Sequence, residues 1–116
     1  MYSVTEEFIK WLSGLEYDAY TYPPADAPDE FVVIERTGGN VENMVDYPTI
    51  AIQTWAKNQP RAEELANAIR NELLTSSKPY GVHHVTVNSG PYPFWDESTR
   101  LPRYQTVYDC TAYLTD

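Results

Sequence analysis

The spacing of apolar positions changes from strand-like to helix-like within residues 46–74. Across residues 48–56, apolar and β-branched residues follow a period of two, which is typical of a half-buried β-strand. The two faces of this predicted strand hold Ile50 and Ile52 on one side, and Ala51, Gln53 and Trp55 on the other. This segment therefore predicts a strand in the interior of a sheet.

A helix is predicted immediately after this strand. It begins at the Asn58-Gln59-Pro60 corner, where proline is favourable because its missing N–H has no partner in a first turn. Apolar residues then recur at helical spacing, and they are Ala62, Leu65, Ala66, Ile69 and Leu73. Because the strands offer the only large apolar surface, we expect this helix to pack across one face of a sheet.

A first helix is predicted over residues 3–14. Ser3 and Glu6 fit a capping box, and Gly14 supplies a stop. The predicted apolar stripe is Val4, Phe8, Trp11, Leu12 and Leu15. We interpret Trp11 as a core residue.

The remaining pattern predicts strands separated by turns. Further extended segments are 19–22, 31–36, 82–88 and 103–114, with turns at 23–29 and 37–40. In the strand at 82–88, His83, Val85 and Val87 would share one face. The order of elements predicts one α+β domain over residues 1–116, with a mainly antiparallel or mixed sheet and two helices on one face.

Two segments of this predicted fold are candidates for contacts with a partner. One is the acidic tip of the hairpin, at residues 37–46. The other is a long loop at residues 90–102, with three prolines and the aromatic residues Tyr92, Phe94 and Trp95. Long loops in small domains are usually functional or disordered, and the aromatic content argues against disorder. These side chains either fold back on their own domain or insert into a neighbour.

Charge is distributed unevenly along the 116 residues, whose net charge is −9. The first fifty residues hold ten acids and two bases, whereas the rest hold seven acids and six bases. This bias disfavours tight binding to nucleic acid, which needs clustered Lys and Arg. A single cysteine excludes an internal disulfide, and no apolar run approaches the ~20 residues that span a bilayer.

Residues that could carry chemistry are present, but the pattern around them favours a non-enzymatic protein. In a regular strand the adjacent His83 and His84 point to opposite faces, so a shared metal site is not expected. Cys110 falls mid-strand on the more apolar face and is interpreted as a buried hydrophobe. Gly38-Gly39 lacks the context of a phosphate loop, and no GxSxG motif is present. We therefore expect no catalytic residue, metal or cofactor.

The chain resembles the tail-terminator, or tail-completion, proteins of long-tailed phages and prophages of Gram-positive bacteria. The similarity covers nearly the whole chain, including AIQTWAKNQPRAEELANAIRNEL at 51–73 and VHHVTVNSGPYPFWDESTRLPRYQTVYDCTAYL at 82–114. Its most telling parts are Ala51-Ile52-Gln53 with Trp55-Ala56, Ser89-Gly90-Pro91-Tyr92, Asp96, and Pro102-Arg103-Tyr104-Gln105. None of these is a catalytic motif.

The resemblance implies a structural role in the virion tail, after assembly in the host cytoplasm. Members of the family have an α+β fold and form a hexameric ring that caps the tail tube and joins it to the neck. DNA passes through the ring without sequence readout, which an acidic lumen would suit. The candidate interface residues on this chain are Tyr92, Phe94, Trp95, Asp96, Arg100, Arg103, Asn40, Glu42 and Met44.

Three other functions remain open from the sequence. The first is a neck or head-completion connector of the same virion, and the second is an acidic inhibitor that mimics DNA. The third, a small hydrolase or ligand-binding enzyme, has the least support because no nucleophile–base pair is recognisable. The sequence does not say which acids would face a lumen.

Overall fold

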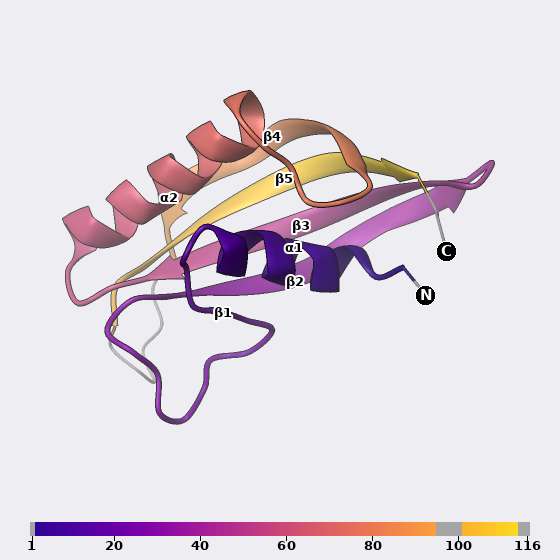
Figure 1. Cartoon of the computed structure of the whole chain (residues 1–116). Coiled ribbons are helices and arrows are strands. Elements are labelled where there is room, and N and C mark those ends of the chain that lie inside the picture. The colour runs from indigo at the N-terminus through magenta and orange to yellow at the C-terminus, as the bar shows by residue number, and fades with distance from the viewer. Residues whose placement is uncertain (1, 95–100, 114–116) are drawn as a thin grey trace.

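The computed structural model describes residues 2–94 and 101–113. Two helices and five strands lie within these ranges (Figure 1). In chain order they are α1 (Val4–Gly14), β1 (Ala19–Tyr20), β2 (Phe31–Glu42), β3 (Val45–Trp55), α2 (Gln59–Thr75), β4 (Val82–Pro93) and β5 (Arg103–Tyr113). The α+β class predicted from the sequence is confirmed.

The five strands form one mixed sheet in the order β1-β2-β3-β5-β4. The short strand β1 is parallel to β2, and the other neighbouring pairs are antiparallel. The helix α2 connects β3 to β4, and β5 fills the space between these two strands. The last strand of the chain therefore lies in the interior of the sheet.

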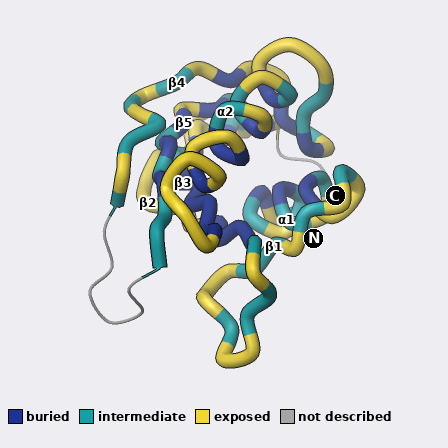
Figure 2. The backbone as a smooth tube through the Cα atoms, turned by 90° about the vertical axis from the view of Figure 1, so that its left-hand side faces the viewer, coloured by how far each residue is buried: buried dark blue, intermediate teal, exposed yellow. Residues whose placement is uncertain are grey.

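Both helices pack on the same face of the sheet, here named the helix-covered face (Figures 1 and 2). Their buried residues meet the inward side chains of β2, β3, β4 and β5 in one core. This core contains Val4, Phe8, Leu12, Val32, Ile34, Ile50, Ile52, Ile69, Leu73, Val82, Val85, Tyr108, Cys110 and Ala112. The other side of the sheet, here named the open face, carries neither of the two helices, α1 and α2.

The bounds of α1 follow the prediction, but Gly14 is not the residue in the left-handed conformation that ends it. The Ser3 side chain accepts a hydrogen bond from the Glu6 backbone N–H at 3.3 Å. Gly14 is the last helical residue, and the left-handed conformation falls on Glu16, at φ 70°. The Tyr17 N–H bonds to the Leu12 carbonyl at 3.0 Å. This arrangement is a Schellman motif with glutamate where glycine is usual.

The helix α2 is confirmed in position and in orientation. Asn58 caps it by accepting a hydrogen bond from the Arg61 N–H at 2.9 Å. The Thr54 hydroxyl of β3 donates to the Ala62 carbonyl at 2.9 Å, which ties the first turn to the sheet. All five residues of the predicted stripe are buried, namely Ala62, Leu65, Ala66, Ile69 and Leu73.

The turn predicted at residues 37–40 is wrong, because β2 continues through it to Glu42. A register shift between Arg36 and Gly38 marks a β-bulge. Gly39 follows at φ +105°, where a Cβ would collide with the backbone of β3. A bulge inserts an extra residue without ending a strand, so this glycine pair extends the hairpin and does not close it.

The chain reverses instead at Asn43 and Met44. Both residues lie at positive φ, at 51° and 66° respectively, between the paired residues Glu42 and Val45. Two left-handed residues in a two-residue loop are the geometry of a type I′ turn, which matches the twist of a hairpin. The usual glycine is absent here, so the sequence signal was weak.

The loop predicted at residues 90–102 is wrong in its first part, because β4 continues to Pro93. Register shifts between Val87 and Ser89, and between Ser89 and Tyr92, accommodate the irregular backbone. Prolines are tolerated here because β4 is an edge strand, where one side of the backbone needs no partner in the sheet. Residues 95–100 lie outside the described ranges.

The predicted face of His83 is also wrong. A register shift between Val82 and His84 precedes Val85, so Val82 and Val85 share the helix-covered face. His83 is exposed, with its ring 4.6 Å from that of Tyr113. A bulge thus leaves both histidines exposed, contrary to simple alternation.

Candidate interaction surfaces

The β2–β3 turn extends beyond the part of the sheet that the helices cover (Figure 1). Exposed apolar side chains lie at this turn and on the strand ends beside it. We name Val41, Met44, Tyr47 and Tyr113 the hairpin surface. Met44 is 72% exposed and Val41 is 57% exposed. Because removing such side chains from water is favourable, this end of the molecule is suited to association.

Two polar residues predicted as contacts lie beside the hairpin surface. Asn40 pairs with Tyr47 in the ladder, and Glu42 pairs with Val45. Both Asn40 and Glu42 are exposed. The three hairpin residues predicted from the sequence, Asn40, Glu42 and Met44, therefore share one end of the molecule.

A bidentate ion pair holds the base of the hairpin. Arg36 donates to both carboxylate oxygens of Asp46, each at 2.7 Å, and the Asp46 side chain is buried. The Arg36 Nε also donates to the Gly38 carbonyl at 3.0 Å, across the bulge. Hydrogen bonding to Asp46 raises the pKa of Arg36 above its usual value. Paired bonds of this kind fix geometry as well as charge.

The opposite end of the sheet is organised by Arg103. Its guanidinium carbon lies 4.8 Å from the centre of the Trp55 ring and 4.0 Å from that of Phe94. The Arg103 Nε donates to the Phe94 carbonyl at 2.7 Å, and Trp55 stacks on Phe31 at 5.1 Å between ring centres. We name Phe31, Trp55, Phe94 and Arg103 the Arg103 cluster.

Amide side chains extend this cluster across the open face. Gln53 donates to Gln105 at 3.0 Å, and Gln105 donates to the Tyr92 hydroxyl at 2.6 Å. Arg103 donates to Gln53 at 3.3 Å. Tyr92 and Phe94 thus pack on their own domain, and both remain partly exposed.

The remaining residues predicted for this loop, Trp95, Asp96 and Arg100, lie outside the described ranges. The hairpin surface and the Arg103 cluster occupy opposite ends of the same strands, because Val45 pairs with Tyr113 and Trp55 pairs with Arg103. The longest dimension of the molecule is 42 Å. The predicted contact residues therefore form two separate surfaces.

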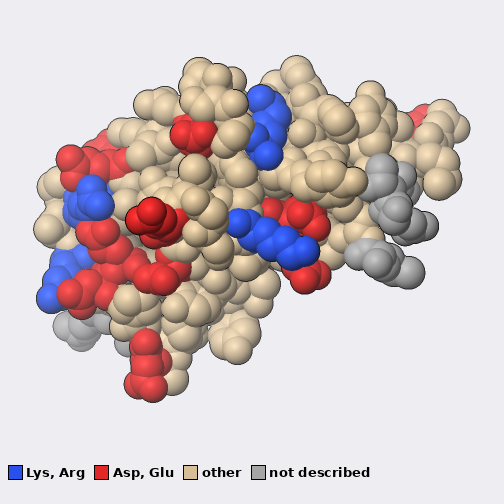
Figure 3. Space-filling view, in the orientation of Figure 1, with Lys and Arg blue, Asp and Glu red and all other residues tan. Residues whose placement is uncertain are grey.

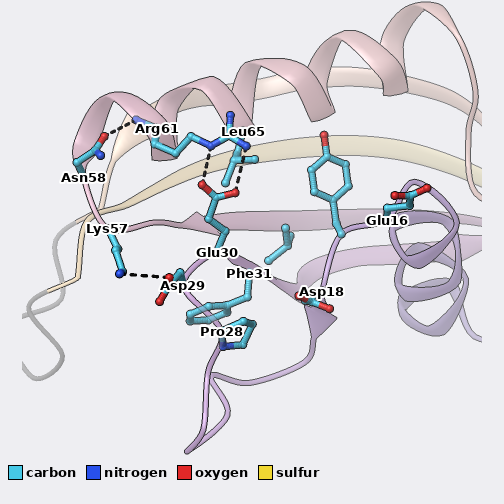
Figure 4. A pocket seen from close by; sticks show the side chains of 12 residues that line it. Glu16, Asp18, Pro28, Asp29, Glu30, Phe31, Lys57, Asn58, Arg61 and Leu65 are labelled. Carbon is cyan, nitrogen blue, oxygen red and sulfur yellow. Dashed lines mark hydrogen bonds and ion pairs between the residues drawn. The ribbon is translucent and has the colours of Figure 1, made fainter.

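A cavity of about 600 Å³ lies between the end of α1, the segment before β2 and the start of α2 (Figure 4). Sequence reasoning missed it, because three separate segments form it. Its walls combine apolar side chains with four acids and two bases. They include Tyr17, Pro28, Phe31, Val32 and Leu65, with Glu16, Asp18, Asp29, Glu30, Lys57 and Arg61.

Ion pairs cross one side of this cavity. Arg61 binds Glu30 through two hydrogen bonds, at 2.6 and 3.1 Å, and Lys57 lies 3.2 Å from Asp29. Hydrogen bonding to Arg61 lowers the pKa of Glu30. Both pairs are largely exposed, so each stabilises the fold only slightly.

Acidic and basic groups alternate around the start of α2 in Figure 3. Within the described residues, five acidic side chains lie in ion pairs: Glu7, Asp29, Glu30, Asp46 and Glu64. The other nine acids of the described residues lie in no ion pair. Ion pairs therefore leave most of the described acidic surface, which a mimic of DNA would also present, without a basic partner.

The cysteine and histidines are not arranged for chemistry in the described part of the chain. Cys110 is buried, as predicted, and burial raises the pKa of its thiol to about 12. A thiol in this state is a poor nucleophile, because the thiolate is the reactive form. Within residues 2–94 and 101–113, no three His, Cys, Asp or Glu side chains could together hold a metal ion.

The helices are too short or too polar to cross a bilayer in the ranges that the structure describes. Known proteins do not extend this description, because no protein-family model matches the chain. No curated protein matches it either.

Proposed function

We propose that the chain is a structural subunit of a phage tail, which caps the tail tube and forms the tail-side joint to the neck. It would act as a ring of copies, six by the resemblance, and would make or break no bond. The observation that carries this proposal is the hairpin surface, which leaves large apolar side chains in water at one end of the molecule. Val41 and Tyr47 project from opposite faces of the hairpin, because Val41 pairs with Asp46 and Tyr47 with Asn40, so neighbours on either face could bury apolar side chains there.

Capping would follow from the shape of the subunit. The hairpin surface would lie against one neighbour in the virion, and the opposite end of the sheet would face the other. Burying one large apolar side chain contributes about 1.5–3 kcal/mol. Each copy adds the same contribution in a ring, so weak contacts per subunit become a stable joint.

The passage of DNA would need no binding residue. Acids outnumber bases strongly among the first fifty residues, and negative charge repels the phosphate backbone. A lumen lined by some of these acids would let DNA slide. The proposal requires no metal or cofactor.

Electron microscopy of particles that lack this protein tests the proposal. Overlong tails are expected if the protein caps the tube. Tails of normal length without heads would instead assign it to the neck, the second role that the same surface could serve. Normal, infectious particles would refute both roles.

Complementation connects that result to the hairpin surface. A chain carrying Val41→Ser and Met44→Ser should leave tails overlong, because its apolar contact is lost. The matched control is Tyr22→Ser, since Tyr22 is 69% exposed but lies outside the hairpin surface. If the double-serine variant and the Tyr22→Ser control both gave tails of normal length, the hairpin surface would not be the capping contact.

A further inference from the structure

The sheet has an exposed strand edge on each side, formed by β4 on one side and by most of β2 on the other. β4 pairs only with β5 among the described residues. β2 is covered by β1 only at Val32 and Val33, and its residues from Glu35 to Glu42 are all exposed. Strand edges present unpaired N–H and C=O groups, which readily bind another strand.

The open parts of the two edges lie at the same level of the sheet. The ladder runs from Glu35 through Ala51 and Val107 to Ser89. By the same pairing, Val41 is level with Val82. The eight free residues of β2 therefore match the first half of β4, residues 82–89.

Both edges are blocked in the half of the sheet that contains the Arg103 cluster. β1 covers β2 at Val33, and Val33 is level with Tyr92 of β4. Pro91 and Pro93 flank Tyr92 and have no N–H to donate. Each edge is thus open over the hairpin half of the sheet and closed over the other half.

Charge distinguishes the two edges. The free part of β2 carries Arg36, whose charge is paired with Asp46. It also carries Glu35 and Glu42, neither of which lies in an ion pair of the described chain. β4 carries no acid, and its charged or chargeable groups at this level are His83 and His84. The free edge of β2 should therefore bind β4 of another copy more favourably than β2 of another copy, since like charges in opposed positions are destabilising.

We propose that the free edge of β2, from Glu35 to Glu42, binds the first half of β4 of a second copy of this chain. Within one sheet β2 and β4 run in opposite directions. Two copies side by side in the same orientation therefore join through an antiparallel ladder. The contact uses different strands on each copy, so it repeats from copy to copy and closes into a ring if the rotation permits.

This inference rests on the proposed function for the ring, and it adds what holds the ring together. Every copy would point its hairpin surface to the same side of the ring. Every Arg103 cluster would then lie on the opposite side. The side with the hairpin surfaces is the one expected to contact a neighbouring component.

Purified protein provides the test, through sedimentation over a range of concentrations and through hydrogen exchange. Assembly is expected to protect backbone amides in residues 35–42 and 84–89 from exchange. An assembly that leaves both segments unprotected would overturn the proposal. A chain that stays monomeric up to millimolar concentration would overturn it as well.

Charge substitutions make the test specific. His84→Glu should weaken self-association by about fivefold, because it adds an acid opposite an acidic edge. Adding Glu42→Lys to this variant should restore association. The control is Ala68→Glu, which adds the same charge at an exposed position of α2 and should leave association unchanged. Equal weakening by both glutamate variants would overturn the proposal.

The two proposals fail in distinguishable ways. If tails end normally in particles with the His84→Glu chain, while loss of the protein gives overlong tails, the capping role stands and the edge contact falls. If the purified chain assembles with protected edges but its loss leaves the tail unchanged, the edge contact stands and the capping role falls.

Discussion

The two ends of the sheet use the same strands in opposite ways. At the Arg103 cluster, aromatic rings stack under one guanidinium, and Trp55 is fully buried. At the hairpin surface, large apolar side chains stay in water. The first end therefore contributes stability to the isolated chain, whereas the second contributes little until a partner covers it.

The largest expected effect separates these ends directly. Trp55→Ala should lower the free energy of unfolding by about 3–5 kcal/mol, because it removes a buried ring from two stacking contacts. Met44→Ala should change it by less than about 0.5 kcal/mol. Urea unfolding of both variants measures the difference. Equal losses would show that the hairpin surface is packed in the isolated chain.

The stability of the fold should depend on pH through Cys110, which lies in the helix-covered core. Burial raises the pKa of Cys110 from 9.0 to about 12. Between these values the folded chain keeps a proton that the unfolded chain releases, so stability falls as pH rises. The slope for one such group is at most about 1.4 kcal/mol per pH unit.

Cys110→Ala is expected to reduce the loss of stability between pH 9 and 11. Part of the slope should remain, because burial also raises the pKa of Tyr108 to about 12. Thermal unfolding at several pH values measures both slopes. An unchanged slope in the alanine variant would show that the thiol is accessible to water.

Breaking the ion pair at the base of the hairpin should lower the free energy of unfolding by an intermediate amount. Asp46→Asn removes one charge from the bidentate pair with Arg36 and should cost about 2 kcal/mol, as for hydrogen bonds to charged groups. Glu42→Gln, at an exposed position, is the control and should cost less than about 0.5 kcal/mol. A similar small cost for both would mean that the ion pair does not hold the base of the hairpin.

The smallest expected effect is that of Met44→Gly, which should raise stability but weaken association. Met44 occupies a left-handed conformation that costs a non-glycine residue about 1 kcal/mol. Met44→Gly should therefore raise the free energy of unfolding by roughly 0.5–1 kcal/mol. The same variant should weaken the proposed contact at the hairpin surface, because an exposed apolar side chain is lost. If Met44→Gly raised both the free energy of unfolding and the strength of association, Met44 would not be part of the contact.

Periodic segments were predictable, because their pattern depends on few distant contacts. The stripe of α2 is buried as predicted, and so are Ile50 and Ile52 of β3. The Gly38-Gly39 pair misled the prediction, because glycine serves a bulge as readily as a turn. The true turn at Asn43 and Met44 lacks the glycine that would have marked it.

Features built from separate segments were not predictable. The packing of Phe94 depends on Arg103, and that pairing follows from the register of two strands. The cavity near Glu30 depends on α1 and α2 as well. The sequence indicated which side chains were unusual, but their distances in space decided which of them pack on the domain itself.

The place of β5 in the sheet has a consequence for synthesis on the ribosome. β5 emerges after β3 and β4, yet it separates them in the sheet. Until β5 emerges, β4 has no neighbour and the apolar stripe of α2 has an incomplete surface to cover. A nascent chain that ends before Arg103 should thus lack a complete sheet and should remain a substrate for chaperones.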